Sequence, residues 1–109
     1  MVSKRKKSKG LKREDKLHNK AVSKRFVVLW GFIDDKYGVF FALSAKLAGT
    51  VLRNRIKRVF REIIRRDIGA QDHLNICLVA KKNTRLERFT TDVRDELEEL
   101  VSKIVKSVR

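Results

Sequence analysis

The chain is poor in the residues that build disulfides, membrane spans and secretion signals. Cys77 is its only cysteine, which excludes an internal disulfide and is typical of a reducing compartment. No apolar run approaches the roughly 20 residues that a membrane-spanning helix needs. The charged N-terminus leads into Leu11-Lys12-Arg13-Glu14 rather than into the apolar core of a signal peptide. We therefore expect a cytoplasmic protein without a membrane partner.

Side chains that could perform catalysis are also scarce. The histidines His18 and His73 stand apart, and no CxxC or HExxH pattern suggests a bound metal. There is no glycine-rich phosphate loop, and the paired acids Asp34 and Asp35 fall in a predicted turn, where such residues are common for conformational reasons. We expect a binding protein with no catalytic residue and no metal ligand of its own.

Acidic residues are outnumbered by basic ones. The 109 residues include 28 Lys and Arg against 13 Asp and Glu, which gives a formal net charge of +15. Such an imbalance indicates the partner rather than the fold, and a polyanion such as nucleic acid fits it best. The hydrophobic content of 42% is enough for one modest core. We divide the chain into a basic arm over residues 1–22, disordered or partly helical, and one RNA-binding domain over residues 23–109.

The predicted elements alternate between strands and helices. Residues 26–33 and 39–44 are β-branched and aromatic runs around a turn cluster at 34–38, which predicts a hairpin. A helix follows from Gly49 or Thr50 to just before Gly69. Residues 73–80 form a third strand. Thr84 and Glu87 match a capping box, so a closing helix is expected from Thr84 onward. This order predicts a small α+β two-layer sandwich with a mixed sheet.

The helix around residues 52–66 carries the strongest functional signal. Its apolar positions fall in one stripe, while Glu62 is the only acid on the opposite side. A helix that is merely solvated would mix charges of both signs, so the unrelieved repulsion indicates an anionic partner. We predict phosphate contacts from this helix and from one lysine that precedes it: Lys46, Arg53, Asn54, Arg55, Lys57, Arg58, Arg61 and Arg65.

Two of these residues have alternative roles. Arg53 lies beside the apolar stripe and could instead hold a loop or the sheet edge in place. Asn54 could be a passenger in the helix, although asparagine is a mediocre helix former and an RNA contact fits it better. Lys46 could grip a phosphate together with the N-terminal backbone N–H groups of the helix.

The segment from Ser44 to Arg66 resembles the protein subunit of bacterial ribonuclease P. That family carries a hallmark close to S-x-K-x-G-N-A-V-x-R-N-R-x-K-R-x-x-R-E, and ten positions of this chain match it. They are Ser44, Lys46, Val51, Arg53, Asn54, Arg55, Lys57, Arg58, Arg61 and Glu62. The chain departs from the hallmark at Ala45, where many members carry a second lysine, and at Ala48-Gly49-Thr50, which replaces Gly-Asn-Ala.

The resemblance implies an αβββαβα sandwich with a left-handed crossover, against the right-handed connection that is otherwise the rule. The first helix is curtailed here, since residues 17–22 contain no aromatic residue. The implied partners are ribonuclease P RNA and precursor tRNA, and the implied activity is removal of the tRNA 5′ leader. The RNA subunit with Mg²⁺ performs the hydrolysis, and no protein motif binds that metal.

A second surface is expected on the sheet. In residues 26–33 one alternate set packs under the helices, and the other could stack single-stranded leader, where each stacked base contributes about 1–3 kcal/mol. The residues assigned to the leader are Phe26, Val28 and Trp30, with a core role as the alternative. A structural RNA-binding protein of the ribosome fits the charge equally well, and only the hallmark spacing separates it. A DNA-binding regulator fits less well, because no helix precedes the basic one in a helix-turn-helix arrangement.

Overall fold

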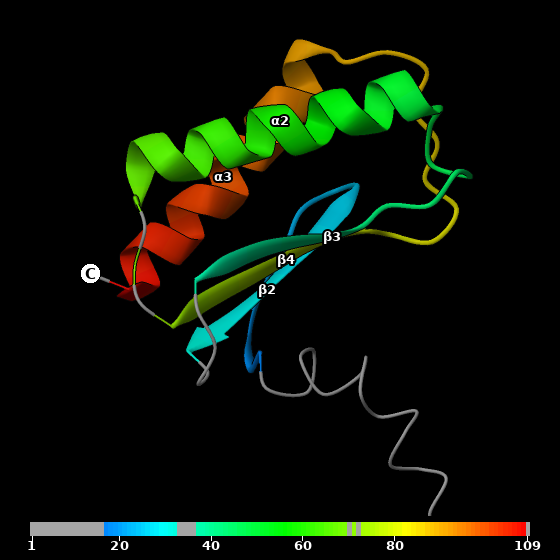
Figure 1. Ribbon diagram of the computed structural model, residues 1–109. Coiled ribbons are helices and arrows are strands. Elements are labelled where there is room, and N and C mark those ends of the chain that lie inside the picture. The colour runs from blue at the N-terminus through cyan, green and yellow to red at the C-terminus, as the bar shows by residue number, and fades with distance from the viewer. Residues whose placement is uncertain (1–16, 33–36, 70, 72, 109) are drawn as a thin grey trace, which may run out of the picture.

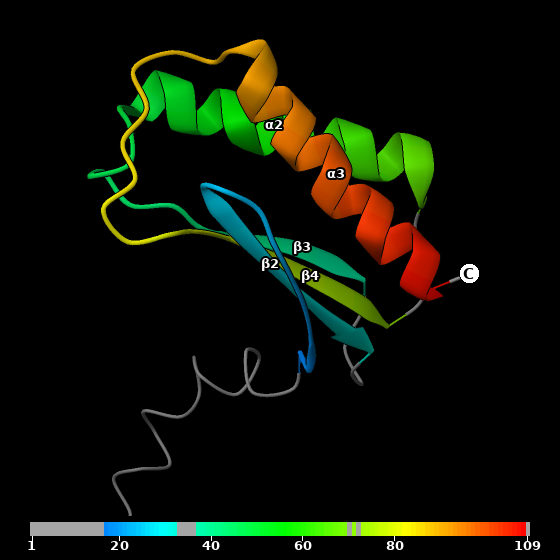
Figure 2. The same cartoon turned by 180° about the vertical axis from the view of Figure 1, so that it is seen from behind.

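Two helices cover one face of a four-stranded sheet. The computed structural model describes residues 17–32, 37–69, 71 and 73–108. The elements in chain order are β1 (Asn19–Val22), β2 (Phe26–Phe32), β3 (Gly38–Ala42), α2 (Thr50–Asp67), β4 (Leu74–Ala80) and α3 (Thr91–Val108). Both helices lie on the same side of the sheet and cross each other (Figures 1 and 2). The predicted α+β two-layer sandwich is confirmed. Neither helix in the described part of the chain is long and apolar enough to cross a membrane.

The sheet is mixed, with the strand order β1-β2-β4-β3. β2 pairs antiparallel with β1 and with β4, whereas β3 runs parallel to β4. The predicted hairpin between β2 and β3 is therefore wrong, because β4 lies between them. β4 is buried from Leu74 to Leu78, including residues that point to opposite faces, so it belongs at the centre of the sheet.

The partner of β2 in a tight hairpin is instead β1, which falls inside the segment expected to be a basic arm. The Ser23 N–H donates to the Phe26 carbonyl oxygen at 2.8 Å and closes this turn. β1 has four residues, of which only Ala21 is buried, so its pattern is too short for a period to be recognised. The order βββαβα is the one that the family resemblance implies after its first helix. Residues 19–22, where the curtailed first helix was expected, form β1 instead, and residues 1–16 lie outside the described residues.

The core lies between the sheet and the helices. Phe26, Val28 and Trp30 point into it and are 0%, 0% and 5% exposed, so the assignment of these three residues to a leader platform is wrong. Strand periodicity places them on one face, and both helices cover that face. The Trp30 indole N–H has no hydrogen-bond partner among the described residues, which shows how fully the ring is enclosed by apolar groups.

α3 begins six residues later than the capping box predicts. The Thr90 hydroxyl accepts a hydrogen bond from the Val93 N–H at 3.4 Å, so Thr90 and not Thr84 caps the helix. Residues 81–90 form a loop whose Leu86 N–H donates to the Leu47 carbonyl oxygen at 2.7 Å. That hydrogen bond holds the loop against the segment before α2. This tertiary contact keeps Thr84 in the loop, although the local sequence pattern predicts a helix cap there.

α2 has the predicted bounds. It ends where Gly69 adopts a φ of 75° and donates its N–H to the Ile64 carbonyl oxygen at 3.0 Å. A residue with a side chain is strained in that conformation, so glycine marks the end of the helix. The buried side of α2 consists of Ile56, Val59, Phe60, Ile63 and Ile64.

Candidate nucleic-acid interface

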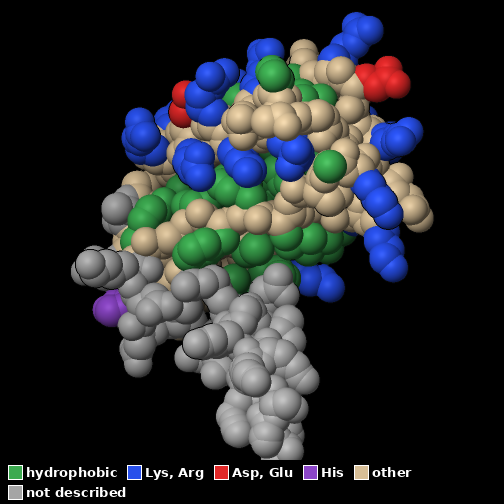
Figure 3. All heavy atoms as spheres, turned by 45° about the vertical axis from the view of Figure 1, so that its right-hand side comes forward, with side chains coloured by type: hydrophobic (Ala, Val, Ile, Leu, Met, Phe, Trp, Pro, Cys, Tyr) green, Lys and Arg blue, Asp and Glu red, His purple; other side chains and the backbone are tan. Residues whose placement is uncertain are grey.

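The outward side of α2 is a cationic ridge, which we define as Asn54, Arg55, Lys57, Arg58, Arg61 and Arg65. All are exposed except Lys57, which is half-buried. The apolar stripe fixes their direction, because it packs against the sheet and α3 and leaves the opposite side to solvent. Figure 3 shows Lys and Arg side chains in a row above a band of hydrophobic side chains. The structure thus brings together six of the eight predicted contact residues.

One row of the ridge lies along the edge of β3. The Lys57 Nζ atom and the Arg61 guanidinium carbon lie 5.9 Å and 4.9 Å from the centre of the Phe41 ring. Arg65 follows at the same helical spacing and lines a cavity with Tyr37. Cations over an aromatic face gain electrostatic attraction, and their side chains are held in one orientation. Lys57 and Arg61 therefore pack against the edge of β3, and Arg65 continues their row.

Arg55 lies on the other flank of the ridge, toward α3. Its guanidinium carbon lies 5.0 Å from the centre of the Phe89 ring, in the loop that precedes α3. Arg58 and Asn54 project between the two flanks and make no cation–π contact with an aromatic ring of the described residues. The ridge consequently has two ordered flanks and a solvated crest.

Arg53 has the structural role that was its alternative. Its Nε donates to the Ala48 carbonyl oxygen at 3.1 Å, and its Nη2 donates to the Thr50 hydroxyl at 3.2 Å. Gly49, the N-cap of α2, has no side chain that could accept a hydrogen bond from the first turn. Arg53 thus holds the loop that enters the helix through two of its N–H donors.

Glu96 and Glu98 of α3 are engaged away from the ridge. Glu96 forms an ion pair with Arg25 and accepts hydrogen bonds from the Ser23 hydroxyl and the Arg25 N–H at 2.8 Å and 2.9 Å. Glu98 lies 3.1 Å from Arg94 and 3.8 Å from Arg66. Within the described ranges no ridge residue takes part in an ion pair, so the positive field of α2 faces solvent.

Arg66 also belongs to α2 but lies outside the ridge, and it does form ion pairs. Its guanidinium is paired with Asp67, with the Nε atom 2.7 Å from the Asp67 Oδ1 atom, and this hydrogen bond raises the pKa of Arg66. Arg66 lies on the flank facing α3 and is neutralised there, which makes it a natural control for the ridge.

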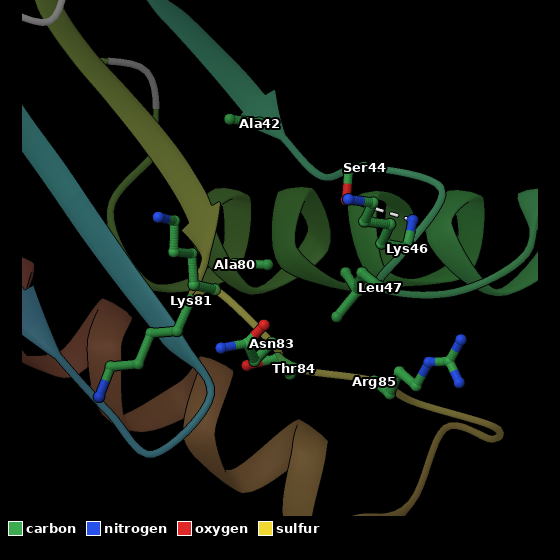
Figure 4. A pocket seen from close by; sticks show the side chains of 10 residues that line it. Ala42, Ser44, Lys46, Leu47, Ala80, Lys81, Asn83, Thr84 and Arg85 are labelled. Atoms are coloured by element: carbon green, nitrogen blue, oxygen red, sulfur yellow. Dashed lines mark hydrogen bonds between the residues drawn. The ribbon is translucent and has the colours of Figure 1, made fainter.

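A basic pocket of about 750 Å³ lies at the carboxyl ends of the parallel strands β3 and β4. Figure 4 shows Ser44 and Lys46 on one side of it and Asn83, Thr84 and Arg85 on the other. The Lys46 N–H donates to the Ser44 hydroxyl at 3.2 Å, which fixes the turn just before α2. Four cationic residues line the pocket: Lys46, Lys81, Lys82 and Arg85. Lys46 therefore lies at the entrance to α2, as predicted, with three cations that the sequence pattern did not single out.

The face of the sheet away from the helices is the second candidate surface. Val27 and Leu29 are half-buried there and alternate with the core residues of β2. Leu29 pairs with Lys20 of β1. Val27 pairs with Val79, which lies near the end of β4 beside the basic pocket.

No group of three or more His, Cys, Asp or Glu side chains that could hold a metal ion occurs among the described residues.

Comparison with known proteins decides between the families that could build such a surface. A family model described as Ribonuclease P matches residues 6–105. This chain belongs to the ribonuclease P protein family. No match was found among curated proteins. The family membership favours the ribonuclease P hypothesis over a ribosomal protein.

Solved structures give the same fold. The Staphylococcus aureus RNase P protein at 2.0 Å is 23% identical, with a TM-score of 0.66 over 87% of this chain and 88% of that one. An S. aureus RNase P protein mutant with defective mRNA degradation activity is 26% identical, with a TM-score of 0.63 over 89% and 82%. The RNase P protein from Thermotoga maritima is 21% identical, with a TM-score of 0.56 over 84% of each chain.

Proposed function

We propose that this chain is the protein subunit of a ribonuclease P holoenzyme that removes the 5′ leader of precursor tRNA. The observation that carries the proposal is the cationic ridge of α2, which faces solvent without a carboxylate partner among the described residues. Its partner is ribonuclease P RNA, whose phosphates the ridge neutralises. The chemistry belongs to that RNA and to Mg²⁺ bound by it, and the protein supplies binding and orientation.

Arginine suits this role because its planar guanidinium donates two hydrogen bonds to one phosphate. The packing of Arg55 and Arg61 against Phe89 and Phe41 lowers the conformational entropy that binding would cost. The paired carboxylates of α3 lie on the flank away from β3, so they do not repel RNA that approaches the crest. The ridge is thus a rigid surface for folded RNA.

Precursor tRNA is assigned to the outer face of the sheet and to the basic pocket. Val27 and Leu29 take the place of the buried set as candidates for leader contact, because they alternate with it along β2. Lys81 and Arg85 in the pocket would hold leader phosphates beyond the end of β4, while Lys46 at the entrance to α2 joins the ridge in binding ribonuclease P RNA. A Leu29→Glu variant should bind ribonuclease P RNA normally and weaken only the binding of precursor tRNA with a leader.

Reconstitution tests the proposal directly. The purified chain is added to the ribonuclease P RNA encoded by the same genome, with precursor tRNA and Mg²⁺ at a concentration too low for the RNA alone. We expect cleavage at the mature 5′ end to appear only when the protein is present. A protein that binds this RNA no better than ribosomal RNA, and leaves cleavage unchanged, would support the structural ribosomal role instead. The reaction takes place in the cytoplasm, where a single thiol such as Cys77 stays reduced.

A further inference from the structure

A cavity of about 370 Å³ lies where the second half of α2 passes over the beginning of β3. Tyr37, Gly38, Val39, Arg61, Arg65 and Gly69 line it. Its volume is within the range of sites that hold a small organic group, which starts near 300 Å³. The cavity lies at the end of the cationic ridge, yet none of the hallmark residues other than Arg61 contributes to it.

Its aromatic wall is Tyr37, the only tyrosine of the chain. The side chain is half-buried, and burial raises the pKa of Tyr37 above its ordinary value of 10.0, while the nearby Arg65 lowers it. The hydroxyl therefore stays protonated near neutral pH, and the ring is a partly desolvated surface beside a cation. An aromatic ring in such a position stacks readily on another planar group.

The cationic wall is held in place by packing. The Arg61 guanidinium lies over the Phe41 ring, and Phe41 in turn meets the buried Phe60 edge-on, with 5.9 Å between the ring centres. Arg65 follows Arg61 by one helical turn and faces Tyr37. Neither arginine forms an ion pair with a carboxylate in the described ranges. Two guanidinium groups thus stand at the mouth of a cavity that has an aromatic side.

The open edge of the sheet adds hydrogen-bonding groups. β3 is the last strand in the order β1-β2-β4-β3, and among the described strands it pairs with β4 alone. An edge strand presents backbone N–H and C=O groups on its unpaired side, and these can bond to the polar edge of a planar heterocycle. Gly38 and Val39 supply this backbone at the cavity.

We propose that this cavity receives one unpaired nucleotide of the RNA bound by α2, with its base stacked on Tyr37 and its phosphate held by Arg61 and Arg65. The inference rests on the proposed function, since it concerns the same RNA. A phosphate alone would need the guanidinium groups and not the aromatic wall. Stacking on Tyr37 requires an unpaired nucleotide, because a base inside a duplex cannot reach a protein ring without unpairing.

Two measurements separate stacking from charge. We expect Tyr37→Ala to weaken binding of ribonuclease P RNA by about 5- to 150-fold, the range for loss of one stacked base. Because stacking releases no counterions, the slope of log affinity against log salt should stay unchanged in Tyr37→Ala, whereas Arg65→Ala should reduce it by about 0.9. Tyr37→Phe keeps the ring and should bind within about twofold of the unchanged chain. Phe32→Ala is the matched control, since Phe32 is an exposed aromatic residue that does not line the cavity.

A photochemical experiment needs no variant. Ribonuclease P RNA transcribed with 5-iodouridine is irradiated with the unchanged protein, and the cross-linked peptide is identified by mass spectrometry. We expect Tyr37 to carry the cross-link. The inference is overturned if the unchanged protein binds the RNA but Tyr37→Ala binds equally well and no cross-link forms at Tyr37. If the unchanged protein does not bind this RNA at all, the proposed function fails, and the inference fails with it.

Discussion

The cationic ridge offers the most direct test of phosphate recognition. Arg58 and Arg61 are exposed and lie outside the core of α2, so replacing both with alanine removes two charges without opening a cavity. Alanine is also the best helix former, which protects the fold of α2. If the proposed function is right, the double variant should lose affinity for ribonuclease P RNA and lose part of its dependence on salt.

The expected salt dependence of binding follows from the number of cations that contact phosphate. Six cations are available to phosphate, namely Arg55, Lys57, Arg58, Arg61 and Arg65 of the ridge together with Lys46. Each neutralised phosphate contributes roughly 0.7–0.9 to the slope, which gives about −4 to −5 for log affinity against log salt. Between 50 and 200 mM salt the affinity of the unchanged protein should fall by roughly 500-fold. The double variant, with a slope near −3, should lose only about 70-fold.

Fluorescence anisotropy of labelled ribonuclease P RNA, titrated at four salt concentrations, measures both slopes. The matched control is Arg66→Ala with Lys103→Ala, which also removes two charges, but from residues paired with Asp67 and Glu99. We expect the control to keep the slope of the unchanged protein. Equal slopes for the two double variants would refute recognition through the ridge. A large fall in melting temperature for Arg58→Ala with Arg61→Ala would assign these residues to stability instead.

Three further predictions concern stability. Arg53→Ala should lower the free energy of unfolding by about 1–2 kcal/mol, because two hydrogen bonds to Ala48 and Thr50 are lost, and urea denaturation measures it. Trp30→Ala should lower the free energy of unfolding by about 3–5 kcal/mol in the same assay, as expected when a large core side chain is removed. Trp30→Phe should lower it far less, because it keeps an aromatic ring and removes a buried N–H that has no partner among the described residues. Burial raises the pKa of Tyr37, so its contribution to stability is complete below pH 10 and is lost as the pH rises further. Urea midpoints between pH 9 and 11.5 should therefore fall less steeply in Tyr37→Phe.

The bounds of α2 and its two sides could be read from the sequence because eighteen residues repeat one helical period without interruption. The strands β2 and β4 were predictable as elements for a similar reason, since both are continuous apolar runs. Their pairing was not predictable. A hairpin between β2 and β3 is the shortest connection, but the burial of β4 on both faces decides the order, and burial is a property of the assembled sheet.

The local sequence pattern also could not predict which face of β2 is buried. Phe26 and Val28 alternate with Val27 and Leu29, and both sets are apolar, so no polar side of the strand indicates solvent. The sequence therefore could not tell which set the helices cover. For the start of α3, two threonines compete as caps, and the bond between Leu86 and Leu47 keeps the first of them in a loop.

The aromatic residues of the interface were missed because they are distant in sequence from the cations they support. Tyr37 directly precedes β3, Phe41 belongs to β3 and Phe89 belongs to the loop before α3. In such places an aromatic residue suggests a strand or a core. Only the crossing of α2 over β3 places Phe41 under Arg61. The angle of Arg53 beside the apolar stripe was the one local signal that separated a structural arginine from its neighbours.

The distribution of charge between the two helices explains why the ridge can exist on a protein that must also fold without RNA. Lys57, Arg61 and Arg65 repeat every four residues, and like charges at that spacing destabilise a helix by a few tenths of a kcal/mol for each pair. Five buried apolar residues of α2 outweigh that repulsion, because each contributes about 1.5–3 kcal/mol when it leaves water. The carboxylates of α3 could have neutralised the ridge, but Glu96 and Glu98 face Arg25, Arg66 and Arg94 instead. The packing of the core therefore sustains an unneutralised positive surface, which is the state from which binding to a polyanion gains the most.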